Sequence, residues 1–403
     1  MRILHLGKYF YPERGGIENY TYILSKEAKK LGYEVYVIVS NTSKKFEHTE
    51  INGIKVFRLP RIFYFFHTPF TPPFLYLIKK INPNIIHLHV PNPWFELNLF
   101  LYSLLYKNIK IVVTYHSDVI WYTPFHFLGE LLRRFYLFPL LKISTKIIAT
   151  SENYVESSPI LKKLLNKIVI IPLGVDEKKF KPIKVKKLRK KVLLFVGRLF
   201  PYKGLEYLLG AVKILSKKRK DFILFIVGAG KLRKKLEKMA RDLKIKNLVE
   251  FTGRLSDEDT MKYYNLCDIF ILPSIHKSEA FGVSQLEAMA CGKPVISTNL
   301  KGSAVPWVNQ HMKTGLIVEP KNSKALANAI LFLLENKEKR EEFGRNARKR
   351  ILKFFTQGKM LKQTISLYKS LYQQKFKTSF HLKKIRKQKT IKLNLYEVLN
   401  EYN

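Results

Sequence analysis

Short runs of β-branched and other apolar residues alternate with amphipathic helical patterns along most of the chain, and this alternation most limits its fold. The first run, RILHLG, is followed by the helical pattern YTYILSKEAKKLG, which Gly32 ends, and then by EVYVIVS. Further runs lie at 84–90, 110–116, 146–151 and 168–174. Strands that alternate with helices form parallel sheets covered by helices, because parallel neighbours need a crossover connection. The sequence therefore predicts an α/β fold.

A Lys-rich stretch at 178–191 interrupts the series, which then starts again. The later runs lie at 192–197, 222–228, 248–253, 269–274, 294–298 and 314–320. A series that restarts after a charged linker indicates two domains of the same class, which we place at 1–174 and 175–356. Ligands bind beyond the carboxyl ends of the strands in such sheets, so a cleft between the domains is the expected site.

Composition limits the possible partners. The net charge of +42 on 403 residues predicts attraction to anions: nucleotides, phospholipid surfaces or nucleic acid. The two cysteines, Cys267 and Cys291, lack the paired spacing of a disulfide scaffold or a zinc site, which favours a reducing, cytoplasmic setting. The N-terminus does not resemble a signal peptide, and no apolar run approaches the roughly 18 residues that span a bilayer. Membrane contact should therefore be peripheral, on the inner face of the cell membrane.

The segment HKSEAFGVSQLEAMACGKPVIST, at 276–298, places two acids around the start of a helix. Good helix formers at 284–290 predict that helix, so Glu279 lies in the loop before it and Glu287 lies inside it. The amino end of a helix after a Gly-containing loop favours a phosphate, whereas nearby acids would accept hydrogen bonds from sugar hydroxyls. The alternative is one acid that stabilises the helix end and one that is solvated.

Two candidates in the first domain follow predicted strands. Gly15 and Gly16 allow backbone N–H groups to approach a phosphate, although an ordinary turn has the same pattern. His116 and Asp118 lie at the carboxyl end of the run at 110–116, and a lone histidine is more often structural than catalytic.

Two further candidates follow strands of the second domain. Arg198 and Lys203 suit a diphosphate, unless their placement is chance in so Lys-rich a chain. Arg254 follows the run at 248–253, at a strand end that can hold a nucleotide base.

The acidic triplet at 257–259 is compatible with a metal site or with a helix start. Ser256 followed by Asp259 predicts a capping box, and acids are favoured in a first helical turn. We expect no metal there.

The order of these motifs resembles a large family. Six motifs follow one another in the order found in the retaining glycosyltransferases of family 4. They are Gly15-Gly16 after a strand, YHSD, PLGVD, VGRLFPYKG, LPSIHKSEAFGVSQLEAMACGKPVI and PWVNQHMKTGLIVEP. The resemblance covers roughly residues 1–372, and its most discriminating piece is the pair of acids seven residues apart. It implies the GT-B fold: two facing Rossmann-like domains with parallel sheets and an interdomain cleft. The helix at 357–374 should cross back onto the first domain, and 375–403 is a basic tail without an assigned function.

The resemblance implies roles for the second-domain residues. Glu287 should accept hydrogen bonds from the ribose hydroxyls, and Glu279 should lie near hydroxyls of the donor sugar. Arg198 and Lys203 should neutralise the leaving diphosphate. The backbone of 281–283, which comprises Phe281, Gly282 and Val283, should meet the same diphosphate.

On the first-domain side, the resemblance makes His116 the histidine beside the transferred sugar and closes Gly15 and Gly16 over the donor. It implies transfer with retention through an oxocarbenium-like transition state, in which the leaving diphosphate helps to deprotonate the acceptor. No metal and no cofactor beyond the sugar nucleotide are expected. The YHSD and PWVN variants favour GDP-mannose over a UDP-hexose as donor and a lipid-linked or polysaccharide acceptor.

Aromatic and basic residues mix at 61–80 and 125–141, on the expected acceptor side. In the second segment helical spacing gives an apolar arc and a polar arc. The apolar arc comprises Phe127, Leu128, Leu131, Leu132 and Phe135, and the polar arc His126, Glu130, Arg133 and Arg134. Such a helix can lie in an anionic bilayer interface, at roughly 1 kcal/mol per basic residue, or pack on its own sheet. The charge of the chain favours the membrane.

Two other classes of protein remain as alternatives. A sugar-nucleotide epimerase or a phosphorylase can share the GT-B fold. A basic protein that binds nucleic acid is suggested by charge alone, and we expect no nucleic-acid partner.

Overall fold

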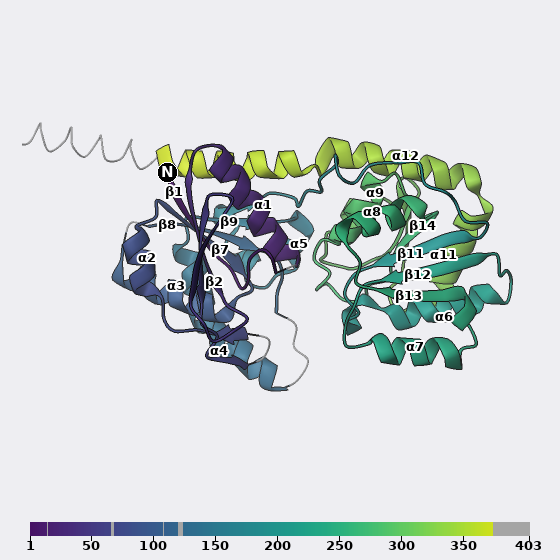
Figure 1. Cartoon of the computed structure of the whole chain (residues 1–403), viewed down its shortest axis with the longest axis horizontal. Coiled ribbons are helices and arrows are strands. Elements are labelled where there is room, and N and C mark those ends of the chain that lie inside the picture. The colour runs from purple at the N-terminus through teal and green to yellow at the C-terminus, as the bar shows by residue number, and fades with distance from the viewer. Residues whose placement is uncertain (14, 66–67, 108, 120–123, 374–403) are drawn as a thin grey trace, which may run out of the picture.

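The computed structural model describes residues 1–403 except 14, 66–67, 108, 120–123 and 374–403, and it has two α/β domains side by side (Figure 1). The basic tail expected at 375–403 lies outside the described residues, as do the side chains at 124–128 and 130. The predicted α/β class with parallel sheets in two domains is confirmed.

The first domain contains an eight-stranded sheet in the order β10-β9-β8-β7-β1-β2-β4-β3. Its strands are β1 (Arg2–Leu6), β2 (Glu34–Ser40), β3 (Glu47–Ile51), β4 (Ile54–Leu59), β7 (Ile85–Val90), β8 (Lys110–Tyr115), β9 (Lys146–Ala149) and β10 (Ile168–Ile170). Among these strands only the edge pair of β3 and β4 is antiparallel. The helices are α1 (Gly16–Lys30), α2 (Leu75–Ile81), α3 (Pro93–Leu105), α4 (Pro124–Ile143) and α5 (Glu152–Ser157), and a small hairpin joins β5 (Phe63–Phe65) to β6 (Thr68–Phe70).

The second domain contains a six-stranded parallel sheet in the order β13-β12-β11-β14-β15-β16. Its strands are β11 (Lys191–Val196), β12 (Phe222–Val227), β13 (Val249–Gly253), β14 (Ile269–Leu272), β15 (Val295–Thr298) and β16 (Gly315–Val318). The helices are α6 (Leu205–Ser216), α7 (Arg233–Asp242), α8 (Asp257–Leu266), α9 (Val283–Ala290), α10 (Val305–Val308), α11 (Ser323–Glu335) and α12 (Lys337–Phe354).

The central strands are buried and mostly apolar because helices cover both faces of each sheet, although β1 and β7 also carry buried histidines. Every residue of β7 and of β14 is buried. After α12, which lies along the second domain, a further helix at 357–373 crosses to the first domain (Figure 1) and packs on its sheet through Met360, Ile365, Tyr368 and Leu371. Full burial of such an aliphatic side chain contributes roughly 1.5 to 3 kcal/mol, so this helix fastens the end of the described chain to the first domain.

Candidate active site

The loop between β14 and α9 holds Glu279 against Lys203 inside the second domain. The carboxylate of Glu279 accepts hydrogen bonds from Lys203 Nζ and from Ser274 Oγ, the latter at 3.0 Å. Glu279 is 8% exposed and Lys203 is 7% exposed, so little water screens the ion pair. The structure therefore brings these two predicted residues together, and the carboxylate compensates the charge of a buried ammonium group.

Two glycines give the backbone beside this ion pair its shape. Gly204 and Gly282 have φ values of 64° and 74°, in the left-handed region that favours glycine. A Cβ atom on Gly204 would lie 2.2 Å from Pro273 O, and one on Gly282 would lie 2.8 Å from a methyl carbon of Leu272. Tight packing as well as the backbone conformation therefore excludes a side chain at both positions.

Gly282 is the residue before α9, so the chain turns into the helix a few residues after Glu279. The N–H groups of a first helical turn, which here begins at Val283, have no acceptor within the helix. The side chain of Phe281 is buried against Trp307 and Phe355, and only the backbone of Phe281 remains for a ligand. This end of α9 thus offers backbone donors close to the Lys203–Glu279 pair.

Glu287 lies inside α9, where its carboxylate accepts a hydrogen bond from Tyr264 Oη at 2.6 Å. Burial raises the pKa of Glu287 to about 7, although the hydrogen bond from Tyr264 acts in the opposite direction. Near neutral pH the side chain is therefore a mixture of acid and carboxylate. Only the carboxylate can accept hydrogen bonds at both oxygens, as two adjacent hydroxyls require.

The two predicted arginines are both exposed. Arg198 follows β11, and its guanidinium lies 5.2 Å from the ring centre of Phe200. It also acts electrostatically on Lys8 and Glu18 of the first domain, so it faces that domain. Arg254 follows β13, and within the described part of the chain no hydrogen bond or ion pair links it to another predicted residue.

At the amino end of α1 a carboxylate occupies the place expected for a phosphate. Gly15 is the residue before the helix, and a Cβ atom on it would lie 2.1 Å from Glu18 Oε2, whereas one on Gly16 would have no neighbour within 4 Å. The positive end of the helix favours this carboxylate. Burial raises the pKa of Glu18, and Lys8 and Arg198 oppose that rise. Glu18 is a candidate that sequence reasoning missed, although a Glu three residues after a Gly cap is a recognisable pattern.

His116 lies just beyond β8, and its backbone N–H donates to Val90 O at 2.9 Å. Its Nε2 atom lies 3.4 Å from Nδ1 of His89, and its ring meets the ring of Tyr20 edge-on at 5.2 Å. Burial lowers the pKa of His116 to about 3. The side chain is therefore neutral at physiological pH and acts as a hydrogen-bonding group, not as an acid.

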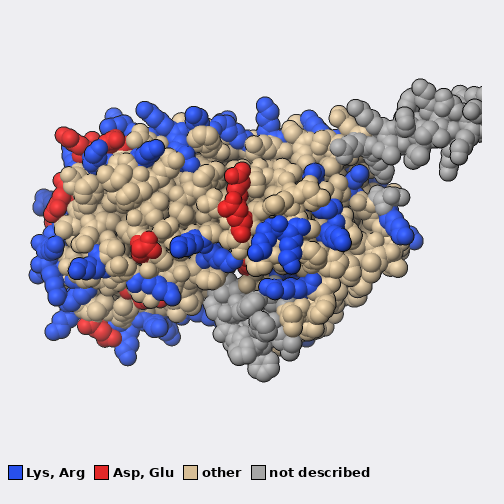
Figure 2. Space-filling view, turned by 180° about the vertical axis from the view of Figure 1, so that it is seen from behind, with Lys and Arg blue, Asp and Glu red and all other residues tan. Residues whose placement is uncertain are grey.

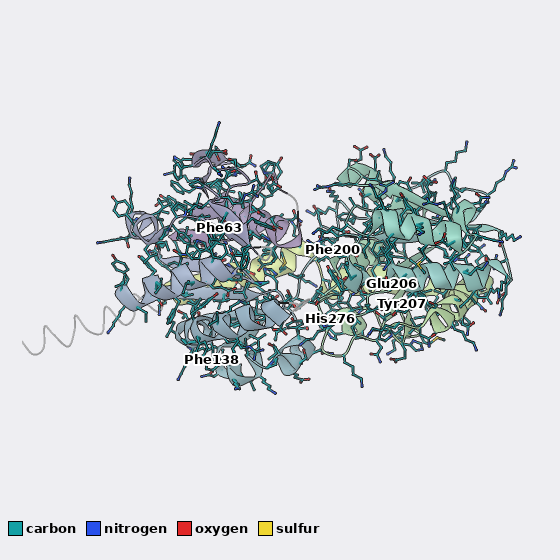
Figure 3. The ribbon with its side chains drawn as sticks, turned by 90° about the horizontal axis from the view of Figure 1, so that it is seen from below. Phe63, Phe138, Phe200, Glu206, Tyr207 and His276 are labelled. Atoms are coloured by element: carbon teal, nitrogen blue, oxygen red, sulfur yellow. The ribbon has the colours of Figure 1, made fainter. Side chains whose placement is uncertain are left out.

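Direct contacts join the two domains beside these residues. Lys277 Nζ lies 3.1 Å from Asp118 Oδ2, and Ser157 Oγ donates to Gly302 O at 2.9 Å. Tyr115 Oη donates to the other oxygen of Asp118 at 2.8 Å, which fixes the carboxylate. Figure 3 places Phe200 and His276 where the second domain faces the first. Sequence reasoning placed Asp118 at this edge but gave no role to Lys277, since nothing in the spacing links positions so far apart.

The acidic triplet at 257–259 forms the predicted capping box at the start of α8. Asp259 N donates to Ser256 Oγ at 3.0 Å, and that hydroxyl donates to Asp259 Oδ2 at 2.7 Å. Asp257 contacts Lys179 at 2.9 Å, and Glu258 lies 3.5 Å from Lys262 one turn further along the helix. The triplet therefore serves the helix end.

The described residues of the predicted apolar arc of α4 are exposed, and one of the predicted polar residues is buried. Leu137, Leu140 and Leu141 of the same helix are fully buried. Leu131, Leu132 and Phe135 are 44%, 58% and 73% exposed. Arg133, placed on the polar arc from the sequence, is 2% exposed, and its Nε donates to Glu96 Oε2 at 2.6 Å. A buried carboxylate on α3, invisible from the helix alone, compensates this charge.

On the face shown in Figure 2, Lys and Arg side chains are scattered over both domains with fewer acids among them. Within the described residues, no helix has the combined length and apolar character that crossing a membrane requires.

Comparison with known proteins agrees with this architecture. The family model described as "Glycosyl transferases group 1" matches residues 176–350, and "Glycosyltransferase Family 4" matches 14–179. The O-antigen chain mannosyltransferase C of Escherichia coli is 32% identical over 384 residues, which cover 93% of this chain and 100% of the relative. The D-rhamnosyltransferase WbpZ of Pseudomonas aeruginosa is 32% identical over 373 residues, which cover 88% and 92%.

Among solved structures, that of the Anabaena protein HepE in complex with UDP-glucose matches with a TM-score of 0.72 at 19% identity, covering 92% of this chain and 100% of that chain. The solved structure supports the fold, and the two full-length relatives establish the family that the motifs resemble. The chain is a glycosyltransferase of family 4, built on the GT-B fold.

Proposed function

We propose that this enzyme transfers a hexose, with retention of configuration, from a nucleoside diphosphate sugar to a lipid-linked or surface-glycan acceptor. The observation that carries the proposal is the Lys203–Glu279 pair beside the amino end of α9. A cation and free backbone N–H groups suit a diphosphate, and a carboxylate next to them suits sugar hydroxyls. A sugar diphosphate carries both kinds of group on one molecule.

In this proposal the residues of the second domain divide the donor between them. Glu287 accepts hydrogen bonds from the ribose hydroxyls, and Glu279 accepts them from hydroxyls of the sugar. Lys203 and Arg198 stabilise the charge that develops on the diphosphate as the glycosidic bond breaks. Arg254 lies at the strand end beside the base. The name of one relative, a mannosyltransferase, supports mannose as the sugar, and together with the YHSD and PWVN motifs it leads us to propose GDP-mannose and not a UDP-hexose as the donor.

The first domain supplies the face on which the acceptor attacks. His116 is neutral, so it orients the sugar through a hydrogen bond and transfers no proton. The leaving diphosphate takes the proton of the acceptor hydroxyl, and the reaction proceeds on one face of an oxocarbenium-like sugar. No step needs a carboxylate nucleophile or a metal ion.

A cavity in the first domain, lined by both polar and apolar residues, is a candidate for part of the acceptor site. It has a volume of about 390 Å³, lies at the carboxyl end of β2, and is separate from the Lys203–Glu279 pair. Asn41, Glu47 and Arg58 are among the residues that line it, and these side chains suit a hydroxylated acceptor.

Exposed apolar groups on the same domain support contact with an anionic membrane. Leu132 and Phe135 on α4 and Phe63 and Phe65 in the β5–β6 hairpin are each more than half exposed. Exposed apolar side chains of this size suit a bilayer interface, and the excess of Lys and Arg draws the domain to anionic headgroups. We therefore propose that the enzyme works on a lipid-linked acceptor while bound to the membrane surface.

The donor is tested by calorimetric titration of the full chain with GDP-mannose, UDP-glucose and UDP-N-acetylglucosamine. We expect clear preference for GDP-mannose and slow release of nucleoside diphosphate without an acceptor. Release of an epimer would favour the epimerase alternative. Binding of none of the three, with steep salt-dependent binding of DNA or RNA instead, would contradict the proposal.

The membrane contact is tested by sedimentation with vesicles that contain about one third anionic lipid. The double substitution L132E/F135E should strongly reduce binding, because it places two acids among apolar groups facing an anionic surface. The matched control is Leu352→Glu on α12, where the side chain is 43% exposed on the other domain. Failure of the unaltered chain to bind the vesicles at low salt, or equal loss in the control, would contradict a membrane surface on α4.

A further inference from the structure

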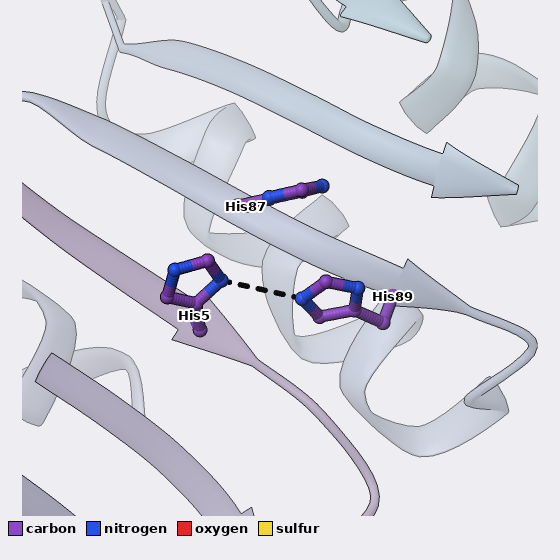
Figure 4. A group of neighbouring side chains, drawn as sticks. All are labelled: His5, His87 and His89. Atoms are coloured by element: carbon purple, nitrogen blue, oxygen red, sulfur yellow. Dashed lines mark hydrogen bonds between the residues drawn. The ribbon is translucent and has the colours of Figure 1, made fainter. Parts of the chain in front are cut away.

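Four histidines meet at the carboxyl end of the first sheet. His5 on β1 and His87 on β7 are paired in register, His89 follows on β7, and His116 lies just beyond β8 (Figure 4 shows the first three). The three strand histidines are at most 1% exposed. Only His116 has a part in the proposed reaction, so the other three need a separate explanation.

Three of these rings form a hydrogen-bonded chain from the site into the core. His116 Nε2 lies 3.4 Å from His89 Nδ1, and His89 Nε2 lies 3.2 Å from His5 Nδ1 (dashed line in Figure 4). The rings of His5 and His89 are inclined by only 16°, and those of His89 and His116 by 28°.

His87 lies beside the chain and is not a link in it. Its Nε2 atom is 2.7 Å from Thr114 Oγ1, and its Nδ1 atom bonds to the hydroxyl of Tyr368. Both nitrogens of this ring therefore have partners outside the chain.

All members of the chain are neutral at physiological pH. Burial lowers the pKa of His5 and of His116 to about 3 and holds the pKa of His89 well below its ordinary value. A neutral imidazole has one N–H donor and one acceptor nitrogen. Each ring must therefore donate in the same direction along the chain as its neighbour.

The buried end of the chain selects that direction. His5 Nε2 is buried and has no hydrogen-bond partner among the described residues. If the chain donates inward, this atom carries a buried N–H without an acceptor. If the chain donates outward, it carries only an unused lone pair, which is the less costly defect because orphaned buried N–H groups are the rarer kind. His5 Nδ1 then donates to His89 Nε2, and His89 Nδ1 donates to His116 Nε2.

We propose that His89 and His5 are positioning residues that fix His116 as the tautomer with its proton on Nδ1. His116 Nε2 is then occupied as an acceptor, and Nδ1, for which the described residues provide no partner, presents an N–H donor to the ligand. This assignment rests on the proposed function for its purpose: the donor meets an oxygen of the transferred sugar, and the ring cannot accept a proton from a sugar hydroxyl at that atom. The tautomer itself follows from the cluster alone.

The same histidines could instead be ligands of a metal ion, since donor atoms of His5, His87 and His89 lie within 4.8 Å of one another. The contacts oppose this alternative. A transition metal needs nitrogen lone pairs at about 2.0 to 2.1 Å that converge on one point. Here His5 and His89 bond directly to each other, and His87 uses both nitrogens on hydroxyls.

The first test is nitrogen-15 NMR of histidine-labelled full-length protein, with the signals of His116 assigned by their loss in His116→Asn. We expect a protonated Nδ1 and an unprotonated Nε2, unchanged from about pH 5.5 to about pH 8.5. A proton on Nε2, or titration to imidazolium within this range, would overturn the proposal. So would stoichiometric binding of Co²⁺ that removes these signals.

The second test separates the chain from the core around it. His89→Leu removes the donor to His116 and should give His116 a mixture of tautomers and lower kcat/KM by roughly 3- to 10-fold. His89→Asn, whose amide nitrogen can replace Nδ1, should restore both. His87→Leu is the matched control, because it disturbs the same core and should leave the His116 tautomer unchanged. An unchanged tautomer in His89→Leu would overturn the proposal, whereas the expected tautomers without transfer from any sugar nucleotide would refute only the proposed function.

Discussion

If Glu287 binds the ribose as proposed, its titration should make binding of the donor depend on pH. Without ligand the pKa of this carboxyl is about 7, because burial disfavours the charged form. Ribose hydroxyls that donate to the carboxylate favour the charged form, so the pKa must fall in the complex. Below pH 7 binding therefore releases a proton, and the affinity falls as the pH falls.

The size of the effect follows from the two pKa values. If binding restores the ordinary value of a glutamate, the dissociation constant rises by about tenfold for each pH unit well below 7. Between pH 7 and about pH 5.5 the expected rise is about 15-fold, since half of the carboxyls are already ionised at the upper limit. Above about pH 8 the affinity should be constant.

Calorimetry measures both the affinity and the proton. GDP-mannose is the suitable probe, because its diphosphate does not itself titrate in this range. At about pH 6, repeating the titration in buffers with different ionisation enthalpies should show close to one proton released per molecule bound. Glu287→Gln is the control: the amide keeps the shape of the side chain, and it should abolish both the proton release and the slope.

Two results would refute this reasoning. One is an affinity of the unaltered enzyme that does not change between about pH 8 and about pH 5.5. The other is an identical slope in Glu287→Gln, which would assign the titration to another group. A folded Glu287→Gln enzyme that binds GDP-mannose as tightly as the unaltered enzyme at pH 8 would also remove Glu287 from the ribose site.

Three further predictions concern the basic residues at the diphosphate, metal ions and the ion pair between the domains. Arg198→Ala and Lys203→Ala should each lower kcat by about 100-fold and affect nucleoside binding far less, because negative charge grows on the diphosphate in the transition state; near-normal turnover of the double variant would place the diphosphate elsewhere. Activity should persist in excess EDTA, and a loss that magnesium or manganese restores would contradict a metal-independent reaction. Lys277→Ala and Asp118→Ala should show a coupling of about 0.5 to 1 kcal/mol in a double-mutant cycle of unfolding, as suits a partly exposed pair; no coupling would mean that the ion pair does not join the domains in solution.

The features predicted best from the sequence are local ones, in which a single residue is present for one conformational reason. Gly282 ends the loop before α9 and the capping box of Ser256 begins α8, and both are local features that a short window contains. The predicted strands were found because buried parallel strands form nearly continuous apolar runs. The edge hairpin of β3 and β4 escaped prediction because β3 is polar, exposed and antiparallel to its neighbour.

The rest depends on contacts between distant parts of the chain. Arg133 lies on the polar arc of α4, but Glu96 on α3 pairs with it and makes the burial of Arg133 possible. His5, His89 and His116 come from three strands or strand ends, and no spacing in the sequence shows that their rings touch. Periodicity predicts which face of a helix or strand is buried. The positions of these residues depend instead on the side chains of the neighbouring element that they contact.

If the proposed site binds the donor, its acids explain how so cationic a chain can select one anion. With 73 basic and 31 acidic residues, attraction to anions is available almost anywhere on the surface and gives no selectivity. At the site Lys203 is compensated by Glu279, and Arg198 lies within the field of Glu18. A bare phosphate that displaces these carboxylates leaves them without partners, at a cost that its own contacts must offset. A sugar nucleotide brings hydroxyls that can donate to the carboxylates along with the phosphates that replace them, so the acids favour the complete ligand over any simpler anion.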